Sequence, residues 1–120
     1  MSESASAVLL DPERVEEIRR VECAAGRYDL FSGFVRTLER NLAGFSAAFA
    51  ACISRGDITG AERAAHTLKG ACRQLGAMAL GDLFADIERC AQAGDYDEAK
   101  RRFDGSATLV AESIEALKRA

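Results

Sequence analysis

The sequence contains no tryptophan, a single proline and a single histidine among its 120 residues. Hydrophobic residues make up 48% of the chain and charged residues 29%. This composition is typical of a soluble, helix-rich globular protein, and it excludes a disordered or fibrous chain. A chain of this length fits one domain with one packed core.

The sequence also has no dense basic cluster and no long hydrophobic run. Sixteen basic and nineteen acidic residues give a net charge of -3, which does not suit a nucleic-acid-binding surface. Residues 1–7 are small and polar, and the apolar run Val8-Leu9-Leu10 is too short for a signal sequence or a membrane span. We therefore expect a cytoplasmic protein that binds neither nucleic acid nor membranes.

Metal ligands are scarce as well. The four cysteines are widely spaced, form no Cys-x-x-Cys pair and have only one histidine to help them bind a metal. They are Cys23, Cys52, Cys72 and Cys90. We expect four reduced thiols, the last three packed in the core as small hydrophobic side chains, with redox sensing as the alternative.

Hydrophobic residues recur at helical spacing along most of the chain. Asp11-Pro12-Glu13 combines an N-cap residue with proline at the first helical position, so a helix should begin there and end at Gly26. Its expected inward positions are Val15, Ile18, Val21 and Ala25. A longer helix should follow from about residue 28, with Phe31, Phe34, Leu38, Leu42, Phe45, Phe49 and Ile53 facing inward.

Three more helices are expected, separated by glycine-containing turns. The third runs from Asp57 to about Leu75, the fourth ends near Gly94, and the fifth continues without a break from Tyr96 to Leu117. The turns Arg55-Gly56-Asp57 and Ala93-Gly94-Asp95 are alike, which indicates one hairpin solution used twice. No segment is typical of a strand.

Short loops between consecutive amphipathic helices favour antiparallel neighbours. The sequence therefore predicts an all-α fold, an up-down antiparallel four-helix bundle with an additional N-terminal helix that covers one end. We expect residues 1–10 to form a flexible tail and residues 11–120 to form the domain.

The single histidine, His66, is expected to face outward. The core stripe of its helix is predicted at Ala64, Leu68, Ala71 and Leu75. At about 100° per residue, His66 lies about 200° from Ala64. Its neighbours one and two turns away include Lys69, Gly70 and Arg73, with Glu62 and Arg63 one turn earlier.

An exposed neutral imidazole is a competent nucleophile near neutral pH, unlike a hydroxyl group, which needs an adjacent base. Gly70 costs about 1 kcal/mol in a helix interior relative to alanine, so close helix packing or access for a partner must compensate. Because Gly70 shares the face of His66, we favour partner access. A lone histidine on a helix is also often just a solvated side chain.

One segment distinguishes these interpretations. Residues 65–77 read AHTLKGACRQLGA, which closely resembles the A-H-x-L-K-G-x-x-x-x-L-G-A core of histidine-containing phosphotransfer (Hpt) domains. The resemblance extends to the long apolar helix upstream, the turn at Gly56 and the turn at Gly94, and leaves out only the first ten residues.

The resemblance implies a phosphorelay function. His66 would accept a phosphoryl group on Nε2 from an aspartyl phosphate of one receiver domain and pass it to another, the partners being receiver domains of response regulators and of a hybrid histidine kinase. Lys69 would give electrostatic support and Gly70 clearance. The Mg²⁺ ion would belong to the receiver, so the chain needs no cofactor. We expect a monomer.

Three further residues are candidates. Some family members have a glutamine 22 residues beyond the histidine, and that position here is Glu88, whose carboxylate could hold the Nδ1 proton. Glu88 could equally be solvated or paired with Arg89 or Arg63. Arg63 and Arg73, with Lys69, could form a basic rim that complements the acidic pocket of a receiver.

Two other functions remain open. An autokinase dimerisation domain also presents histidine on a helical bundle, but acidic residues and proline usually follow that histidine, and this sequence has no glycine-rich ATP-binding segment. We therefore expect a phosphoryl carrier that has no autokinase activity. The second alternative is a non-catalytic adaptor or decoy bundle that binds receivers or kinases without covalent chemistry.

Overall fold

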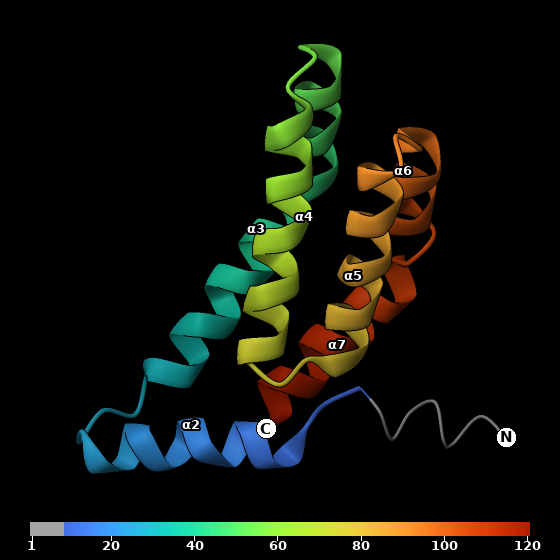
Figure 1. Ribbon diagram of the computed structural model, residues 1–120. Helices are drawn as coiled ribbons and strands as arrows, with labels where there is room; N and C mark the ends of the chain where they lie inside the picture. The colour runs from blue at the N-terminus through green and yellow to red at the C-terminus, as the bar shows by residue number, and fades with distance from the viewer. Residues whose placement is uncertain (1–8) are drawn as a thin grey trace, which may run out of the picture.

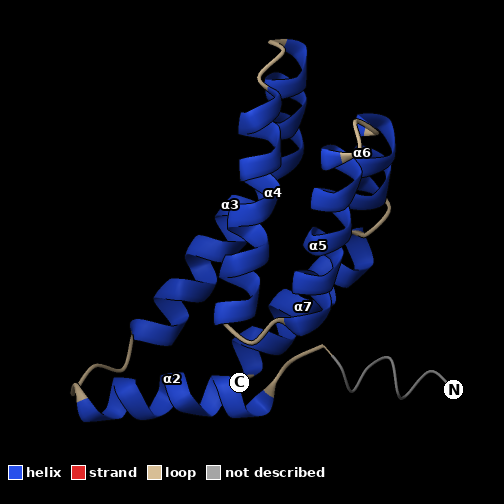
Figure 2. Cartoon of the chain, viewed as in Figure 1, coloured by secondary structure: helices blue, strands red, loops and turns tan. Residues whose placement is uncertain are grey.

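The computed structural model describes residues 9–120, and this part of the chain is all-α, as predicted (Figures 1 and 2). Its helices are α2 (Pro12–Ala24), α3 (Leu30–Ser54), α4 (Ile58–Gln74), α5 (Met78–Gln92), α6 (Tyr96–Asp104) and α7 (Ala107–Arg119). Residues 9–120 contain no strand, only an isolated bridge between Leu10 and Ala77. None of the described helices is long and apolar enough to cross a membrane.

The helices form an up-down bundle with a crossing helix at one end. Figure 1 shows α3 and α4 as one hairpin beside a second unit made of α5, α6 and α7, while α2 lies across the end that holds the chain's C-terminus. The predicted four-helix bundle with an additional N-terminal helix is therefore confirmed. The fourth position of the bundle is shared by α6 and α7.

The predicted fifth helix is wrong as a single element. It breaks between Asp104 and Ala107, where Gly105 closes α6 and Ser106 precedes α7. The Ser106 hydroxyl donates a hydrogen bond to the Phe103 carbonyl (2.6 Å). Glycine and serine are both poor residues for a helix interior, because glycine is too flexible and the serine side chain bonds to nearby backbone. The hydrophobic spacing continues across this interruption, so it predicted one helix where the structure has two.

The two similar turns do use one solution, as predicted. Gly56 and Gly94 both have a positive φ, 75° and 80°, which glycine adopts without strain. Each is followed by an aspartate whose side chain caps the next helix: Asp57 accepts from the Gly60 N–H (2.9 Å) and Asp95 from the Glu98 N–H (3.3 Å). The first of these caps sets where the helix of His66 begins.

An aromatic cluster forms the centre of the bundle. The Phe45 ring packs against Phe84 edge-on at 5.1 Å between centroids, against Phe103 at 4.9 Å and against Phe49 at 5.4 Å. Such edge-to-face pairs add to the free energy gained from burying the rings. The cluster joins α3, α5 and α6 and so holds α5 in the position that the site requires.

Some predicted inward positions are wrong. Val21 is 60% exposed and Phe34 is 46% exposed, and Ala25 is exposed as well. The buried neighbours are Glu22 and Val35. Phe34 lines a groove of about 580 Å³ between α2, α3 and α4.

The buried Glu22 attaches α2 across the end of the bundle. Its carboxylate accepts a hydrogen bond from the Phe31 N–H at the start of α3 (2.9 Å) and pairs with Arg19 (2.9 Å). The bond from Phe31 and then the bond from Arg19 lower the pKa of Glu22, so the carboxylate is ionised at neutral pH. Arg19 also donates to the Ala120 carbonyl oxygen (3.0 Å) and lies over the Phe31 ring.

The segment before α2 fixes the turn that follows α4. The Asp11 N–H donates to the Gly76 carbonyl (2.7 Å), and the Ala79 N–H donates to the Leu9 carbonyl (3.5 Å). Leu9 and Leu10, which we placed at the end of the flexible tail, therefore contact the α4–α5 turn. The rest of that predicted tail lies outside the described residues.

The four cysteines are free thiols, and burial separates them chemically. Cys72 is fully buried, Cys52 and Cys90 pack partly against the core, and Cys23 is exposed. The predicted core packing of the last three is confirmed. Burial raises the pKa of the Cys72 thiol to about 12.

We expect this burial to control alkylation, because the thiolate is the reactive form. At pH 8, iodoacetamide should modify Cys23 in the folded protein and reach Cys72 only after unfolding in urea, as peptide mass spectrometry would measure. Equal modification rates of the two thiols without denaturant would contradict the buried position of Cys72.

Candidate functional site

His66 lies in the middle of α4 on an outward face, as predicted, and its side chain is 65% exposed. The buried stripe of α4 is shifted from the predicted one. Ala61, Ala65, Leu68 and Cys72 are buried, whereas Ala64 and Ala71, expected in the core, are only partly buried and face the grooves between α3 and α4. Ala65 faces the core, and His66 lies next to it on the side of α4 that is turned toward α5, since its side chain contacts Glu88 of α5.

A carboxylate of α5 holds one nitrogen of the imidazole. The Nδ1 atom of His66 lies 3.0 Å from Oε2 of Glu88. No described residue makes a hydrogen bond with the Nε2 atom. An ionised carboxylate only accepts hydrogen bonds, so the proton of this pair is on Nδ1, and the lone pair of the neutral ring is on Nε2.

Lys69 occupies the second oxygen of the same carboxylate. Its Nζ atom lies 2.7 Å from Oε1 of Glu88, and the Glu88 side chain is only 13% exposed. The hydrogen bond from Lys69 is the main cause that lowers the pKa of Glu88, and the bond from His66 lowers it further. Glu88 is therefore a carboxylate at neutral pH with both oxygens in use.

The alternative ion pairs considered for Glu88 do not form. Arg89 pairs with Asp86, and Arg63 makes no ion pair with any residue between 9 and 120. Sequence reasoning named the correct glutamate for the imidazole, but it did not anticipate that Lys69 would share that glutamate.

The surface around His66 is open. A shallow pocket of about 230 Å³ next to the imidazole is lined by Thr59, Glu62, Arg63, His66 and Glu88. One turn further along α4, a Cβ atom added at Gly70 would meet no atom within 4 Å. Close helix packing therefore does not explain the glycine, and a second protein can approach the imidazole over this turn.

The predicted basic rim is only partly present. Arg73 pairs with Asp82 (3.5 Å) and lies across Gly81, where an added Cβ atom would come within 2.7 Å of the Arg73 Cγ atom. With Lys69 on Glu88, Arg63 is the one predicted rim cation without an ion pair in the described structure. Arg40 of α3 lines the same groove of about 510 Å³ as Arg63.

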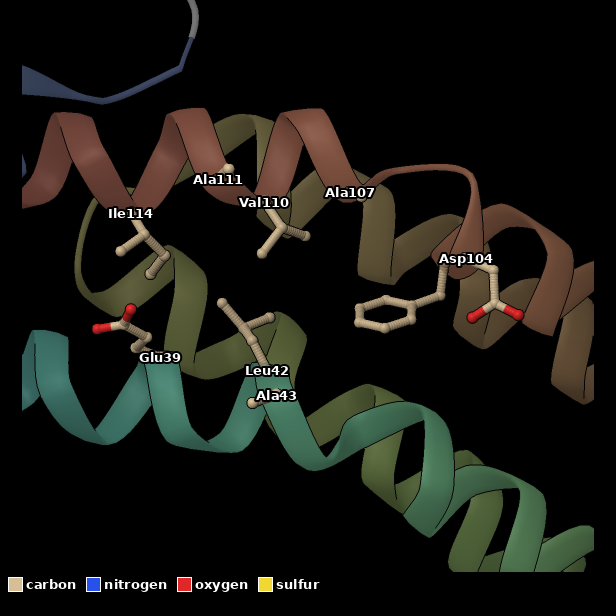
Figure 3. A pocket seen from close by; sticks show the side chains of 9 residues that line it. Glu39, Leu42, Ala43, Asp104, Ala107, Val110, Ala111 and Ile114 are labelled. Carbon is tan, nitrogen blue, oxygen red and sulfur yellow. The ribbon is translucent and has the colours of Figure 1, made fainter.

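A second groove lies between α3 and α7 and differs in chemistry. Figure 3 shows Leu42 of α3 and Val110 of α7 pointing toward each other, with Glu39 and Asp104 toward opposite ends. Its volume is about 460 Å³. Lys118 pairs with Glu39 (3.2 Å) and Lys100 with Asp104 (2.9 Å). Both carboxylates of the groove are therefore paired with lysines, and no histidine or cysteine lines it, so His66 remains the candidate for covalent chemistry.

The sequence model of the Hpt domain matches residues 29–120, which include α3 to α7 and all of the residues around His66. The chain belongs to the Hpt domain family. Membership supports a general phosphotransfer role in phosphorelays and implies interaction with receiver domains. Searches of curated proteins and of solved structures each found no match.

Sequence reasoning missed three residues that shape this Hpt domain's surface. Thr59 lines the His66 pocket, and Arg40 lines the groove beside Arg63. Gly81 has no Cβ atom and so leaves room for the Arg73 side chain. Thr59 lies two turns before His66 on the same helix face, so helical spacing could have found it. Arg40 and Gly81 come from neighbouring helices, and only the register between helices brings them near α4.

In residues 9–120, no group of three histidine, cysteine or acidic side chains is placed to bind a metal ion.

Proposed function

We propose that this Hpt domain relays a phosphoryl group on His66, from the aspartyl phosphate of one receiver domain to the aspartate of another. The supporting observation is the imidazole itself, which is mostly exposed, is held at Nδ1 by Glu88 and has no hydrogen bond from a described residue at Nε2. Such an arrangement presents a nucleophilic nitrogen to a partner and lacks a catalytic apparatus of its own.

The transfer step conserves atoms and charge. The Nε2 lone pair attacks the phosphorus of the aspartyl phosphate, the N–P bond forms, and the P–O bond to the aspartate breaks with its electron pair on the leaving carboxylate. The second receiver accepts the group by the reverse sequence. A divalent ion that neutralises the phosphoryl oxygens would be held by the receiver, because Glu88, the carboxylate in contact with His66, already has both oxygens in use.

The neighbours of His66 have distinct roles in this proposal. Lys69 adds positive charge beside the imidazole, and Gly70 provides clearance for the receiver. Arg63, which has no partner among the described residues, supplies the positive charge that meets the acidic pocket of the receiver. Arg73 is a more distant contributor, since Asp82 partly neutralises it.

We also propose that residues 11–120 act as one domain, in the cytoplasm and as a monomer. Support for the single domain comes from α2, which precedes the stretch matched by the family yet is attached to α3 through Glu22 and to the α4–α5 turn through Asp11.

The test is incubation with radiolabelled phosphoreceiver domains of the same organism. We expect label to appear on this chain within the time of a receiver's own decay, in a bond that is labile to acid and stable to base, as phosphohistidine is. If several receivers bind the folded chain and none transfers label to it, the chain is instead an adaptor or decoy that binds receivers without covalent chemistry.

A further inference from the structure

The charge on the imidazole changes when Nε2 is phosphorylated. The nucleophilic form of the ring has its proton on Nδ1, next to the Glu88 carboxylate, and a lone pair on Nε2. Once that lone pair forms the N–P bond, a ring that keeps the Nδ1 proton carries a positive charge. The atom closest to this charge is Oε2 of Glu88, at 3.0 Å from Nδ1.

We propose that the Glu88 carboxylate keeps the proton on Nδ1 after His66 is phosphorylated, so that the ring is released as neutral imidazole when the phosphoryl group departs. This inference rests on the proposed phosphotransfer at His66 and concerns the protonation state of the phosphorylated ring. Glu88 is thus a positioning residue that also controls the leaving group.

The leaving group determines how fast the phosphoryl group moves on. When the N–P bond breaks, its electron pair returns to Nε2. With a proton on Nδ1 the ring leaves as neutral imidazole, whereas without that proton it leaves as an imidazolate anion, which is far more basic and a much poorer leaving group. The relay therefore needs a protonated ring at the pH of the cell.

An isolated imidazole does not meet this need. A ring that titrates near pH ~6.5, as an ordinary imidazole does, keeps its proton in only about 3% of molecules at pH 8. An opposite charge in hydrogen-bonding contact shifts such a titration by about 1–3 pH units in favour of the charged form. Glu88 is in this contact and is mostly buried, so solvent screens its charge weakly.

The other charged groups around the ring do not replace Glu88. On α4, Glu62 and Arg63 line the pocket and Lys69 contacts the second oxygen of Glu88. Glu62 has no hydrogen bond to the imidazole in the described structure. On α5, the facing group is Glu88 itself. Lys69 lowers the pKa of Glu88 and lies on the carboxylate, which limits repulsion between Glu88 and an incoming phosphoryl group.

Three proteins test the inference: the wild type, Glu88→Gln and Glu62→Gln. Glutamine at position 88 can still accept a hydrogen bond from Nδ1–H, so it removes the charge and keeps the tautomer. Glu62→Gln is the matched control, because it removes one negative charge from the same pocket without touching Nδ1. All three are phosphorylated with phosphoramidate, a small donor that needs no receiver.

The ring protonation is then followed by ¹⁵N and ³¹P NMR against pH, together with the rate of phosphoryl loss to water. We expect the wild type and Glu62→Gln to retain the Nδ1 proton to a pH at least about one unit higher than Glu88→Gln. At pH 8.5, phosphoryl loss should be roughly tenfold slower in Glu88→Gln, because a titration one unit lower leaves about a tenth as many of its rings protonated at this pH. At pH 5.5 the three rates should agree.

Coincident titrations of the wild type and Glu88→Gln, with both proteins folded by circular dichroism, would overturn the inference and leave His66 as the phosphoryl acceptor. A shift of equal size in Glu62→Gln would also overturn it, because any nearby charge would then suffice. If none of the three proteins is phosphorylated on His66, the proposed function itself fails.

Discussion

Replacing His66 by glutamine is expected to reduce phosphoryl labelling from a phosphoreceiver to background. The amide nitrogen of glutamine is delocalised into the carbonyl and is not a nucleophile, whereas the Nε2 atom of His66 has an available lone pair. Labelled receiver is mixed with each protein, and the label on this chain is measured over time.

The fold and the receiver interaction should survive that replacement. The His66 side chain is 65% exposed. The free energy of unfolding of the protein, measured by urea denaturation, should therefore change by about 1 kcal/mol or less. Receiver binding, measured by calorimetry, should change little. Label that persists on the folded variant would assign the phosphoryl group to another residue and contradict the proposed acceptor.

Replacing Gly70 by glutamine is expected to separate two kinds of phosphorylation. The new side chain would stand on the outward face of α4 one turn from His66, where no atom lies within 4 Å of an added Cβ. A receiver would meet this side chain on docking, so transfer from the receiver should fall by at least about tenfold, the equivalent of ~1.4 kcal/mol of binding or activation free energy. Phosphoramidate is small, and its reaction with His66 should be unchanged.

The stability of this variant should rise, because glutamine forms helices better than glycine by about 0.5–1 kcal/mol. Gly33→Gln on α3 is the control, since it also replaces a helical glycine, in the first turn of α3, and lies on a different helix from His66. Unchanged transfer from the receiver to Gly70→Gln, at equal or higher stability, would show that Gly70 does not provide clearance.

Features that depend on local sequence could be predicted. Asp57 and Asp95 cap helices through their own side chains. Gly56 and Gly94 have a positive φ. Each of these features depends only on residues a few positions away in the sequence. The outward position of His66 also follows from the periodicity of one helix. These elements explain why the helix order and the bundle were correct.

Features that depend on the packing between elements could not be predicted. Phe34 and Val35 are adjacent and both apolar, and only the contacts of α3 decide that Val35 is buried and Phe34 is 46% exposed. The fifth helix kept its hydrophobic spacing across Gly105, so the pattern did not reveal the break. On α4, Ala64 and Ala71 are only partly buried because they face grooves beside α3, and the periodicity of α4 alone does not contain this information.

The candidate site shows the same division. His66, Lys69 and Gly70 lie on one helix, and spacing placed them on one face. The pairing of Lys69 with Glu88 and that of Arg73 with Asp82 cross from α4 to α5, and depend on a register that no single-helix pattern contains. Glu88 was found through the resemblance to Hpt domains and not through its own local sequence.

The most direct test of the relay uses three proteins in one reaction: a labelled donor receiver, this Hpt domain and an acceptor receiver that does not exchange phosphoryl groups with the donor. The account predicts that label passes through the wild-type chain and reaches the acceptor, and that the acceptor stays unlabelled when His66→Gln replaces the wild type. Equal labelling of the acceptor with the wild type, with His66→Gln and without any Hpt domain would contradict the claim that His66 carries the phosphoryl group.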